Sequence, residues 1–466
     1  MSVSTDRVLK LSQVLKGFAP REELPLAGYL ADIPRLDSLA LLPPGTPVLV
    51  RGDVDAKPGP KLGDGDIRLR SMKETLEFGR AKGWKQIIFG HRGRKEKDKP
   101  IGSLDKVAAR LGEILGCDVP VIEDWLDEAT GTVKDHVQAT VAAAAPGSVL
   151  MLKNVRAYDI ETILWKAKED ALAGLAPKLA AFANSLAEKV AVNYVNEALS
   201  AGSLDASSTI VPLAMQKVAL GSYVAREFTG PMMDCLQAQL VVFSGIKIDK
   251  LDDLEAMIAR GTIRTIFSAG SLAMALKKAE MKAAGQEFSL GVSEDPAHKD
   301  KPYYIPPERI EQAGRMLAAG KSHGIEFVLP VDFTLGDGRV VETMQAGDQQ
   351  FDVGPKTSAL FEQKVGQFID AHRGQRVAAF HNGVFGMFED ARFEAGTKAF
   401  IAQLKRMKDA GIAVYVGGGE GGTALEKYGQ PDWVTHCFTA GGTVLNALGA
   451  EPVPYLVALR AAAKGL

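Results

Sequence analysis

Short apolar runs rich in β-branched residues recur along the chain, and each is followed by a glycine-rich or charged loop and then by a segment with helical periodicity. Strands that are buried on both faces of a parallel sheet have this continuous apolar pattern, and helices form the crossovers between them. The strands predicted in this way cover residues 47–51, 86–90, 148–152, 189–195, 240–245, 265–270, 326–331, 377–383 and 413–419. Nine strands exceed the usual share of one sheet. The pattern therefore predicts an α/β fold with two doubly wound parallel-sheet domains that face a cleft.

The segments between these strands predict where the domains meet. Apolar residues recur at intervals of three and four in 104–115 and 176–190, which indicates amphipathic helices. The stretch 220–236 also reads as helix, with a break at Gly230-Pro231, and it lies midway along the chain. We therefore predict an interdomain helix there. The remaining chain is assigned to a first domain, a second domain and a C-terminal segment that returns toward the first, over 1–219, 237–440 and 441–466.

Composition narrows the class of protein. A formal net charge of -2 argues against a general nucleic-acid binder, which needs a surplus of Lys and Arg. Cys117, Cys235 and Cys437 lie far apart without a CxxC pair, so neither a disulfide framework nor a zinc site is expected. The N-terminus has no long apolar region, and no run of about 18 apolar residues occurs. We expect a cytoplasmic monomer that binds small molecules, without nucleic-acid or membrane partners.

One strand near the C-terminus runs into a glycine-rich turn, residues 417–422, and then into a helical segment. Such a turn makes an anion site, because backbone N–H groups point outward and the helix dipole favours negative charge. The same letters satisfy GxGxxG, which allows a dinucleotide site. That motif usually lies in the first βα unit with an acid at the end of the next strand, and here it comes late without that acid. A plain flexible loop is a further alternative.

Polar residues follow two other strands of the second half. Asn382 and Glu389 come after the strand at 377–383, where open α/β sheets bind ligands. Lys247 and Lys250 follow the strand at 240–245 and have the charge to meet phosphate oxygens. The alternatives are a turn satisfied by Asn382 and a solvated helix start at the two lysines.

The first half places basic groups at the ends of its strands. Four strand ends that converge would form a clamp for phosphate or carboxylate. The basic stretch after His91 has a solvated loop as its alternative for everything beyond Arg94. The candidate residues, with the acids that follow the first strand, are Arg51, Asp53, Asp55, Arg68, Arg70, His91, Arg92, Arg94 and Arg156.

The order of the motifs is more specific than any one of them. VLVRGDVD, DIRLR, HRGR, LKNVR, VNEA, SGIKIDK, DVGPKT, HNGVFGMFE, GGGEGG and FTAGGTVL follow one another as in phosphoglycerate kinases. From about Ile33 to the C-terminus the chain resembles that family. The resemblance implies a first domain that holds 3-phosphoglycerate and a second that holds Mg²⁺ with ADP or ATP.

The resemblance also implies roles for individual residues. The positions that match the family's acceptor site are Asp53, Asp55, Arg68, His91, Arg94 and Arg156. Those that match its nucleotide site are Lys247, Lys250, Asn382, Glu389, Gly417, Gly418, Gly419, Glu420 and Gly421, with Glu389 on the ribose hydroxyls and Glu420 on the metal. Arg68 and Lys247 are the cations that we expect to neutralise the transferring phosphoryl group.

Several positions depart from the family pattern. Asp55 stands where the family has asparagine, and a carboxylate there repels an acidic substrate unless it is protonated or paired. A stretch rich in histidine and arginine is replaced by Ser203-Leu204-Asp205-Ala206, and one residue is missing between Lys247 and Lys250. Glu420-Gly421 replaces an aspartate and a threonine or serine; glutamate can still ligate magnesium through oxygen.

The resemblance therefore implies reversible phosphoryl transfer between 1,3-bisphosphoglycerate and MgADP, a glycolytic type of reaction. A carboxylate acceptor is already ionised, so no general base is needed, and catalysis depends on positioning and on cations. With the two ligands on different domains, a hinge near Leu220 is expected to close the cleft. The alternatives are a relative that acts on another acyl phosphate, a catalytically silent ADP- or ATP-binding protein, and an NAD-dependent oxidoreductase.

Overall fold

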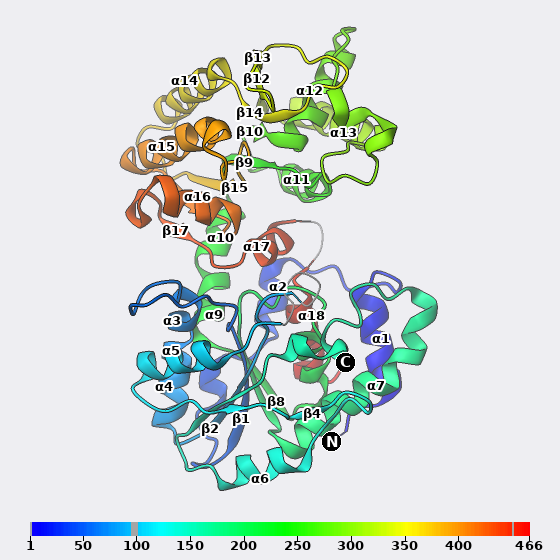
Figure 1. Cartoon of the computed structure of the whole chain (residues 1–466), viewed down its shortest axis with the longest axis vertical. Helices are drawn as coiled ribbons and strands as arrows, with labels where there is room; N and C mark the ends of the chain where they lie inside the picture. Colours follow the sequence, from blue (N-terminus) through cyan, green and yellow to red (C-terminus); the bar gives the residue numbers. More distant parts are fainter. Residues whose placement is uncertain (1, 95–100, 450–451) are drawn as a thin grey trace. The chain divides into compact units, whose positions relative to one another are not determined.

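A computed structural model describes residues 2–94, 101–449 and 452–466 (Figure 1). The chain divides into two compact units: unit 1 comprises Met1–Phe228 with Pro452–Leu466, and unit 2 comprises Thr229–Glu451. Each unit contains a six-stranded sheet whose neighbouring strands are parallel. The predicted α/β class with two parallel sheets is therefore confirmed.

The sheet of unit 1 has the strand order β3-β6-β2-β1-β7-β8. The chain adds strands on one side of β1 first and then continues at β7 on the other side, so the order reverses between β1 and β7. Such a reversal opens a crevice at the carboxyl ends of the two strands. The strands are β1 (Pro47–Gly52), β2 (Lys85–Phe89), β3 (Val121–Ile122), β6 (Val149–Leu152), β7 (Asn193–Glu197) and β8 (Lys217–Leu220).

Nearly every residue of the central strands is buried, which shows that both faces of this sheet are covered. Figure 1 shows α3, α4 and α5 to one side of the strands, and α1 and α7 to the other. A small hairpin, β4 (Leu126–Asp127) and β5 (Thr132–Val133), packs against α7. The helices are α1 (Thr5–Leu15), α2 (Leu26–Ala31), α3 (Ile67–Ser71), α4 (Lys73–Ala81), α5 (Asp105–Leu115), α6 (Asp135–Ala143), α7 (Glu169–Lys189), α8 (Ala206–Thr209), α9 (Ser222–Thr229) and α18 (Pro454–Lys464).

The sheet of unit 2 repeats this plan with the order β11-β10-β9-β15-β16-β17, and its reversal lies between β9 and β15. A separate antiparallel sheet of β12, β13 and β14 was not predicted from the sequence. The strands are β9 (Leu240–Gly245), β10 (Thr265–Ala269), β11 (Glu326–Val328), β12 (Phe333–Leu335), β13 (Val340–Val341), β14 (Gln350–Val353), β15 (Ala378–Asn382), β16 (Ala413–Val416) and β17 (His436–Cys437).

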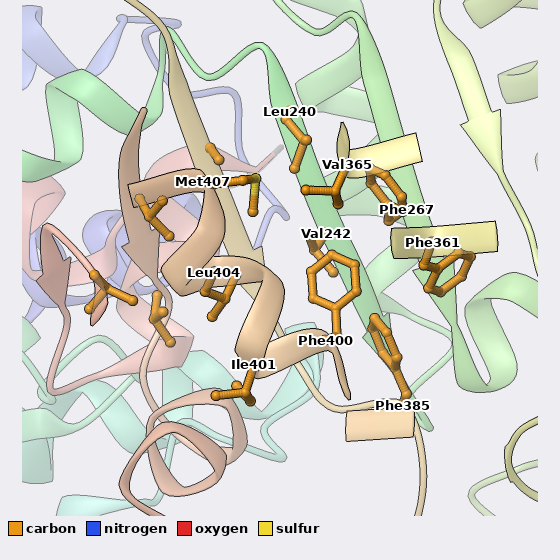
Figure 2. Packing of buried hydrophobic residues seen from close by; sticks show 14 of the residues in the cluster. Leu240, Val242, Phe267, Phe361, Val365, Phe385, Phe400, Ile401, Leu404 and Met407 are labelled. Carbon is orange, nitrogen blue, oxygen red and sulfur yellow. The ribbon is translucent and has the colours of Figure 1, made fainter. Parts of the chain in front are cut away.

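Aromatic side chains fill one side of the unit 2 sheet, where α14 and α15 pack on β9 and β10 (Figure 2). Phe361 meets the ring of Phe267 edge-on at 5.4 Å between centroids, and Phe400 lies against both. Such contacts add to the burial of apolar area. The helices are α10 (Pro231–Cys235), α11 (Lys250–Ala259), α12 (Gly270–Ala283), α13 (Pro307–Ser322), α14 (Pro355–Ala371), α15 (Ala395–Asp409), α16 (Glu420–Tyr428) and α17 (Gly441–Leu448).

The stretch 220–236 forms two helices, α9 and α10, separated at Gly230. Pro231 occupies the first turn of α10, where its missing N–H costs nothing. The change from unit 1 to unit 2 falls at Phe228–Thr229, inside this stretch. In the described part of the chain, none of the helices is long and apolar enough to cross a membrane.

Candidate functional site

Two predicted residues of unit 2 meet at the reversal of its sheet. Lys250 is the first residue of α11, after β9, and Asn382 is the last residue of β15. The Lys250 Nζ donates to Asn382 Oδ1 at 3.0 Å and to the Ser244 carbonyl at 3.3 Å. Burial lowers the pKa of the Lys250 ammonium. Lys247, by contrast, is exposed at the same edge, and its charge also lowers the pKa of Lys250.

The glycine turn lies beside these residues, because β16 is the neighbour of β15. The Gly417 N–H donates to the His381 carbonyl at 2.8 Å, and a Cβ at Gly417 would lie 2.5 Å from Asn382 Nδ2. Gly418 has φ 73°, and a Cβ there would lie 2.3 Å from the Phe438 carbonyl oxygen. Only glycine fits both positions without a shift of the chain. The turn leads into α16, and the first N–H groups of a helix favour anions in general.

The two acids predicted for this site, Glu420 and Glu389, are both exposed, unlike Lys250 and Asn382. Glu420 is exposed as the first residue of α16, and its carboxylate acts on Lys250 by raising the pKa of the ammonium. Gly421 is buried behind it, whereas Glu389 is exposed in the turn after β15. Among the described residues, no group of three or more His, Cys, Asp or Glu side chains could hold a metal ion. Glu420, the acid expected to bind magnesium, can supply one carboxylate oxygen as a ligand.

In unit 1, Arg68 lies between two acids that follow β1. Its Nη1 is 3.1 Å from Asp55 Oδ2 and 3.8 Å from Asp53 Oδ1. Asp53 is fully buried and accepts from the Ser200 hydroxyl at 2.7 Å, which joins the end of β1 to the loop after β7 across the reversal of the sheet. Burial raises the pKa of Asp53. Asp55 also accepts from the Gly93 N–H at 3.0 Å.

His91 and Arg156 lie close to Arg51, and all three side chains are buried in the interior of unit 1. His91 is 4% exposed, Arg156 6% and Arg51 0%. Arg51 Nη2 lies 2.7 Å from His91 Nδ1, and since arginine only donates, Nδ1 accepts and the proton of the neutral ring is on Nε2. Burial and then the nearby arginines lower the pKa of His91 well below its ordinary value.

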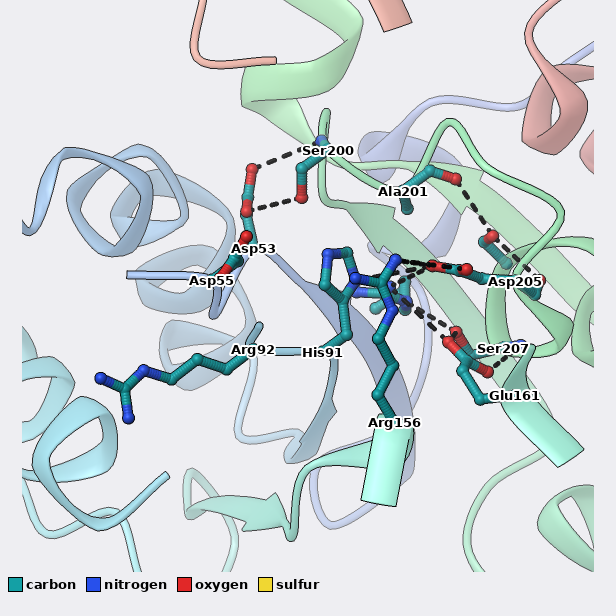
Figure 3. A network of polar contacts seen from close by, with 12 residues as sticks. Asp53, Asp55, His91, Arg92, Arg156, Glu161, Ser200, Ala201, Asp205 and Ser207 are labelled. Carbon is teal, nitrogen blue, oxygen red and sulfur yellow. Dashed lines mark hydrogen bonds and ion pairs between the residues drawn. The ribbon is translucent and has the colours of Figure 1, made fainter. Parts of the chain in front are cut away.

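A carboxylate that was not predicted as a site residue occupies the centre of this group. Asp205 Oδ2 lies 3.2 Å from Arg156 Nη2 and 3.5 Å from Arg51 Nη2. Figure 3 shows Asp205 facing Arg156. Asp205 Oδ1 accepts from Trp165 Nε1 at 3.1 Å. In the sequence, the only sign of a role for Asp205 was that residues 203–206 depart from the family pattern.

Two further residues, Glu161 and Arg94, interact with this group. Glu161 Oε1 accepts from the Ser207 hydroxyl at 2.6 Å; burial raises the pKa of Glu161 to about 7, and the Asp205 charge adds to the rise. Arg94 is exposed beyond this group and acts on it by lowering the pKa of His91. The basic loop predicted beyond Arg94 lies largely in 95–100, outside the described residues.

Comparisons with known proteins agree on one family. The family model described as phosphoglycerate kinase matches residues 41–451. The cytosolic phosphoglycerate kinase of Triticum aestivum is 29% identical over 89% of this chain and 95% of its own length, and the phosphoglycerate kinase of Bifidobacterium longum (strain DJO10A) is 30% identical over 89% and 97%. The structure of phosphoglycerate kinase from Pyrococcus horikoshii covers 93% of this chain and 100% of its own, with a TM-score of 0.68 at 22% identity. That structural likeness concerns the fold.

Proposed function

The chain belongs to the phosphoglycerate kinase family, and we propose from this premise that it transfers a phosphoryl group between a nucleotide and an acyl phosphate. The resemblance implies 1,3-bisphosphoglycerate and MgADP as substrates, and 3-phosphoglycerate and MgATP as products. Family membership supports a kinase in general, and the residues at the two sheet reversals decide how far this particular reaction applies.

One observation carries the nucleotide half of the proposal: Lys250, Asn382 and the turn at 417–419 meet at the reversal of the unit 2 sheet. In open α/β sheets this is where ligands bind. The glycines at 417–419 have no side chains that would cover the first N–H groups of α16. A polyphosphate is the ligand that suits N–H groups at a helix N-terminus beside two lysines.

The proposed chemistry needs cations more than it needs a base. A carboxylate acceptor is ionised at neutral pH, so the protein must align the reacting groups and neutralise the phosphoryl group as it moves. We assign this neutralisation to Arg68 of unit 1 and to Lys247 of unit 2, which is exposed and therefore available. Mg²⁺ bound with the nucleotide would add positive charge, with Glu420 as its ligand from the chain.

The acceptor half of the proposal uses Asp53, Asp55, Arg68, His91, Arg94 and Arg156 of unit 1. Because the nucleotide groups belong to unit 2, the reaction requires a hinge-bending movement that brings the two ligands together and excludes water. We further propose that the protein acts as a cytoplasmic monomer.

A second candidate function is favoured by the placement of Asp205. Its carboxylate pairs with Arg51 and Arg156, which leaves fewer free cations for a phosphate-bearing acceptor. A relative that acts on a different acyl phosphate, or a silent nucleotide-binding protein, would tolerate this arrangement.

A coupled assay for ATP formation tests the proposal. The purified full-length protein is given MgADP with 1,3-bisphosphoglycerate and, separately, with acetyl phosphate as an acyl phosphate without a second phosphate. ATP from either compound supports phosphoryl transfer, and the ratio of the two kcat/KM values assigns the acceptor. MgADP binding without ATP from either compound would contradict the proposed transfer from these acyl phosphates and favour a silent nucleotide-binding protein.

A further inference from the structure

The basic groups at the strand ends of unit 1 already have an anionic partner that the chain itself supplies. Asp205 is completely buried and lies among donors from three separate segments: Arg51 of β1, Arg156 after β6, and Trp165. The Arg156 guanidinium also stacks on the Trp165 ring at 4.9 Å from its centroid. A charged pair with this many partners in the interior is held in a single arrangement.

A count of charges shows how little positive charge remains for a ligand. Arg51 and Arg156 contribute two positive charges, Asp205 one negative charge, and Glu161 part of another, since burial raises its pKa to about 7. His91 is neutral because burial lowers its pKa. Arg68 is shared between Asp53 and Asp55. Among these residues a phosphate group with two negative charges therefore meets almost no unpaired cation, and Arg94, a further predicted cation of the site, is exposed beyond them.

A phosphate that bound Arg156 Nη2 would displace Asp205 from it. That step would leave a buried carboxylate without its partners, which is strongly unfavourable. An acceptor with a single carboxylate makes a smaller demand, because it carries one negative charge where the phosphate carries two, and Arg68, although paired with Asp53 and Asp55, is 25% exposed in its side chain. The carboxylate of Asp205 thus opposes one class of acceptor and leaves the other unaffected.

We propose that Asp205 is a specificity-determining residue, the built-in anionic partner of Arg51 and Arg156, which makes unit 1 accept carboxylates and acyl phosphates that lack a second phosphate group. The inference rests on the proposed phosphoryl transfer and names the acceptor class for that site. Asp205 acts through the two arginines as a positioning residue and does not contact the substrate.

Direct binding of two matched ligands tests this inference without turnover. Glycerate and 3-phosphoglycerate differ by one phosphate group, and each is titrated calorimetrically into the full-length protein with MgADP present. In the native protein we expect glycerate to bind at least as tightly as 3-phosphoglycerate. Tighter binding of 3-phosphoglycerate by about tenfold or more, which is about 1.4 kcal/mol, would overturn the proposal.

The variant Asp205→Asn keeps the shape of the side chain and frees the charge of the arginines. It should bind 3-phosphoglycerate and inorganic phosphate at least about tenfold more tightly than the native protein does. The matched control is Asp118→Asn, which removes an exposed carboxylate elsewhere in unit 1 and should change neither affinity. Unchanged phosphate binding in a folded Asp205→Asn protein would overturn the proposal, and if that variant does not fold, the glycerate comparison in the native protein decides.

The two proposals fail in different ways. Loss of the proposed phosphoryl transfer would appear as MgADP binding without ATP formation, whereas failure of the Asp205 inference would appear in the affinities for glycerate and 3-phosphoglycerate, whether or not ATP forms.

Discussion

Lys247 and Lys250 follow the same strand, yet the structure gives them different environments. Lys250 is held by Asn382 and the Ser244 carbonyl, whereas Lys247 is exposed. A lysine already engaged with the backbone has less freedom to follow a phosphoryl group that moves during the reaction. The difference between the two side chains makes Lys247 the better candidate for a contact that strengthens in the transition state.

The substitution Lys247→Ala should therefore lower kcat by about 100-fold or more and change nucleotide affinity by only a few-fold, because the lost charge acts mainly on the transition state. Steady-state kinetics and ADP titration measure the two effects. Lys321→Ala, which removes an exposed lysine from α13, is the control and should change neither. Equal losses in rate and in affinity would show that Lys247 is a ground-state contact.

Asp55 is the second residue whose charge bears on the acceptor. It accepts from Arg68 Nη1 at Oδ2, 3.1 Å away, and from the Gly93 N–H at Oδ1, so an asparagine, which has one carbonyl oxygen, keeps one of the two contacts. If 3-phosphoglycerate is a substrate, Asp55→Asn should lower its KM several-fold, because like charges about 4 Å apart repel by up to roughly 4 kcal/mol at an effective dielectric near 20 and solvent removes most of this. Steady-state kinetics checks it, and an unchanged or raised KM would contradict the expectation.

Single residues were predicted from the sequence more easily than their partners. The candidate cations could be named because strand ends are recognisable from apolar runs. Their pairing with Asp205 could not be predicted, because Asp205 lies 49 positions from Arg156 and a hydrogen bond over that distance depends on how β6 and the loop after β7 are brought together. Glu161 and Trp165 gave no local signal. Burial of His91 and Arg156, which decides whether they can bind a ligand, is likewise a property of packing.

Among the elements, the glycine turn before α16 has the most exacting backbone. Gly418→Ala should abolish or greatly weaken nucleotide binding, because its φ of 73° and the nearby Phe438 carbonyl leave no room for a Cβ. Gly422→Ala is the matched control, because Gly422 lies inside α16 and a Cβ there would meet Cys437 Sγ at 3.4 Å, an ordinary contact distance. Alanine is also about 1 kcal/mol more favourable than glycine within a helix.

Isothermal titration with MgADP compares the two variants. Normal nucleotide binding by the Gly418→Ala protein would mean that the turn is not the phosphate site.

The start of α9 depends on a buried acid. Glu197 accepts from the N–H groups of Tyr223 and Val224 at 3.0 and 3.3 Å, and burial raises its pKa to about 7 from an ordinary value of 4.5. Between these values the unfolded chain loses its proton before the folded protein does. The free energy of unfolding should therefore fall as the pH rises through this window, by at most on the order of 3 kcal/mol from this group.

The variant Glu197→Gln cannot ionise, so its stability should depend less on pH over the same window. Urea unfolding of both proteins at about pH 5 and about pH 8 measures the difference. Parallel pH profiles for the two proteins would show that Glu197 does not titrate in this range.

The elements themselves were predicted where their pattern is strong. Each of the nine apolar runs overlaps a strand of one of the two parallel sheets, although β7 begins four residues later than its predicted run, and the break at Gly230-Pro231 separates α9 from α10. The nine runs did not include the edge strands β3, β8 and β17, the hairpin of β4 and β5, or the small sheet of β12, β13 and β14. These strands have two to four residues each, so their apolar runs are too short to stand out in the sequence, and their partners define them.

At the scale of the whole molecule, the proposed nucleotide site should link ligand binding to stability. MgADP or MgATP should raise the melting temperature, because a ligand at ~100 times its Kd adds about 2.7 kcal/mol to the folded form that binds it. NAD should not, since the residues around the turn at 417–419 match a phosphate site of the kinase type. A melting curve unmoved by saturating MgADP would remove the basis of the nucleotide assignment, and a shift with NAD alone would favour an oxidoreductase.

Unit 1 is built from both ends of the chain, with all of unit 2 between them. The last helix, α18, contributes Tyr455, Leu456 and Leu459 to the interior of unit 1, where each is at most 1% exposed. On the ribosome, a domain closes only after its final segment has left the exit tunnel. Unit 1 is begun first, yet it lacks α18 until residues 452–466 have been made, after the whole of unit 2. The unit that is begun first therefore receives its last buried residues after the other unit has been made.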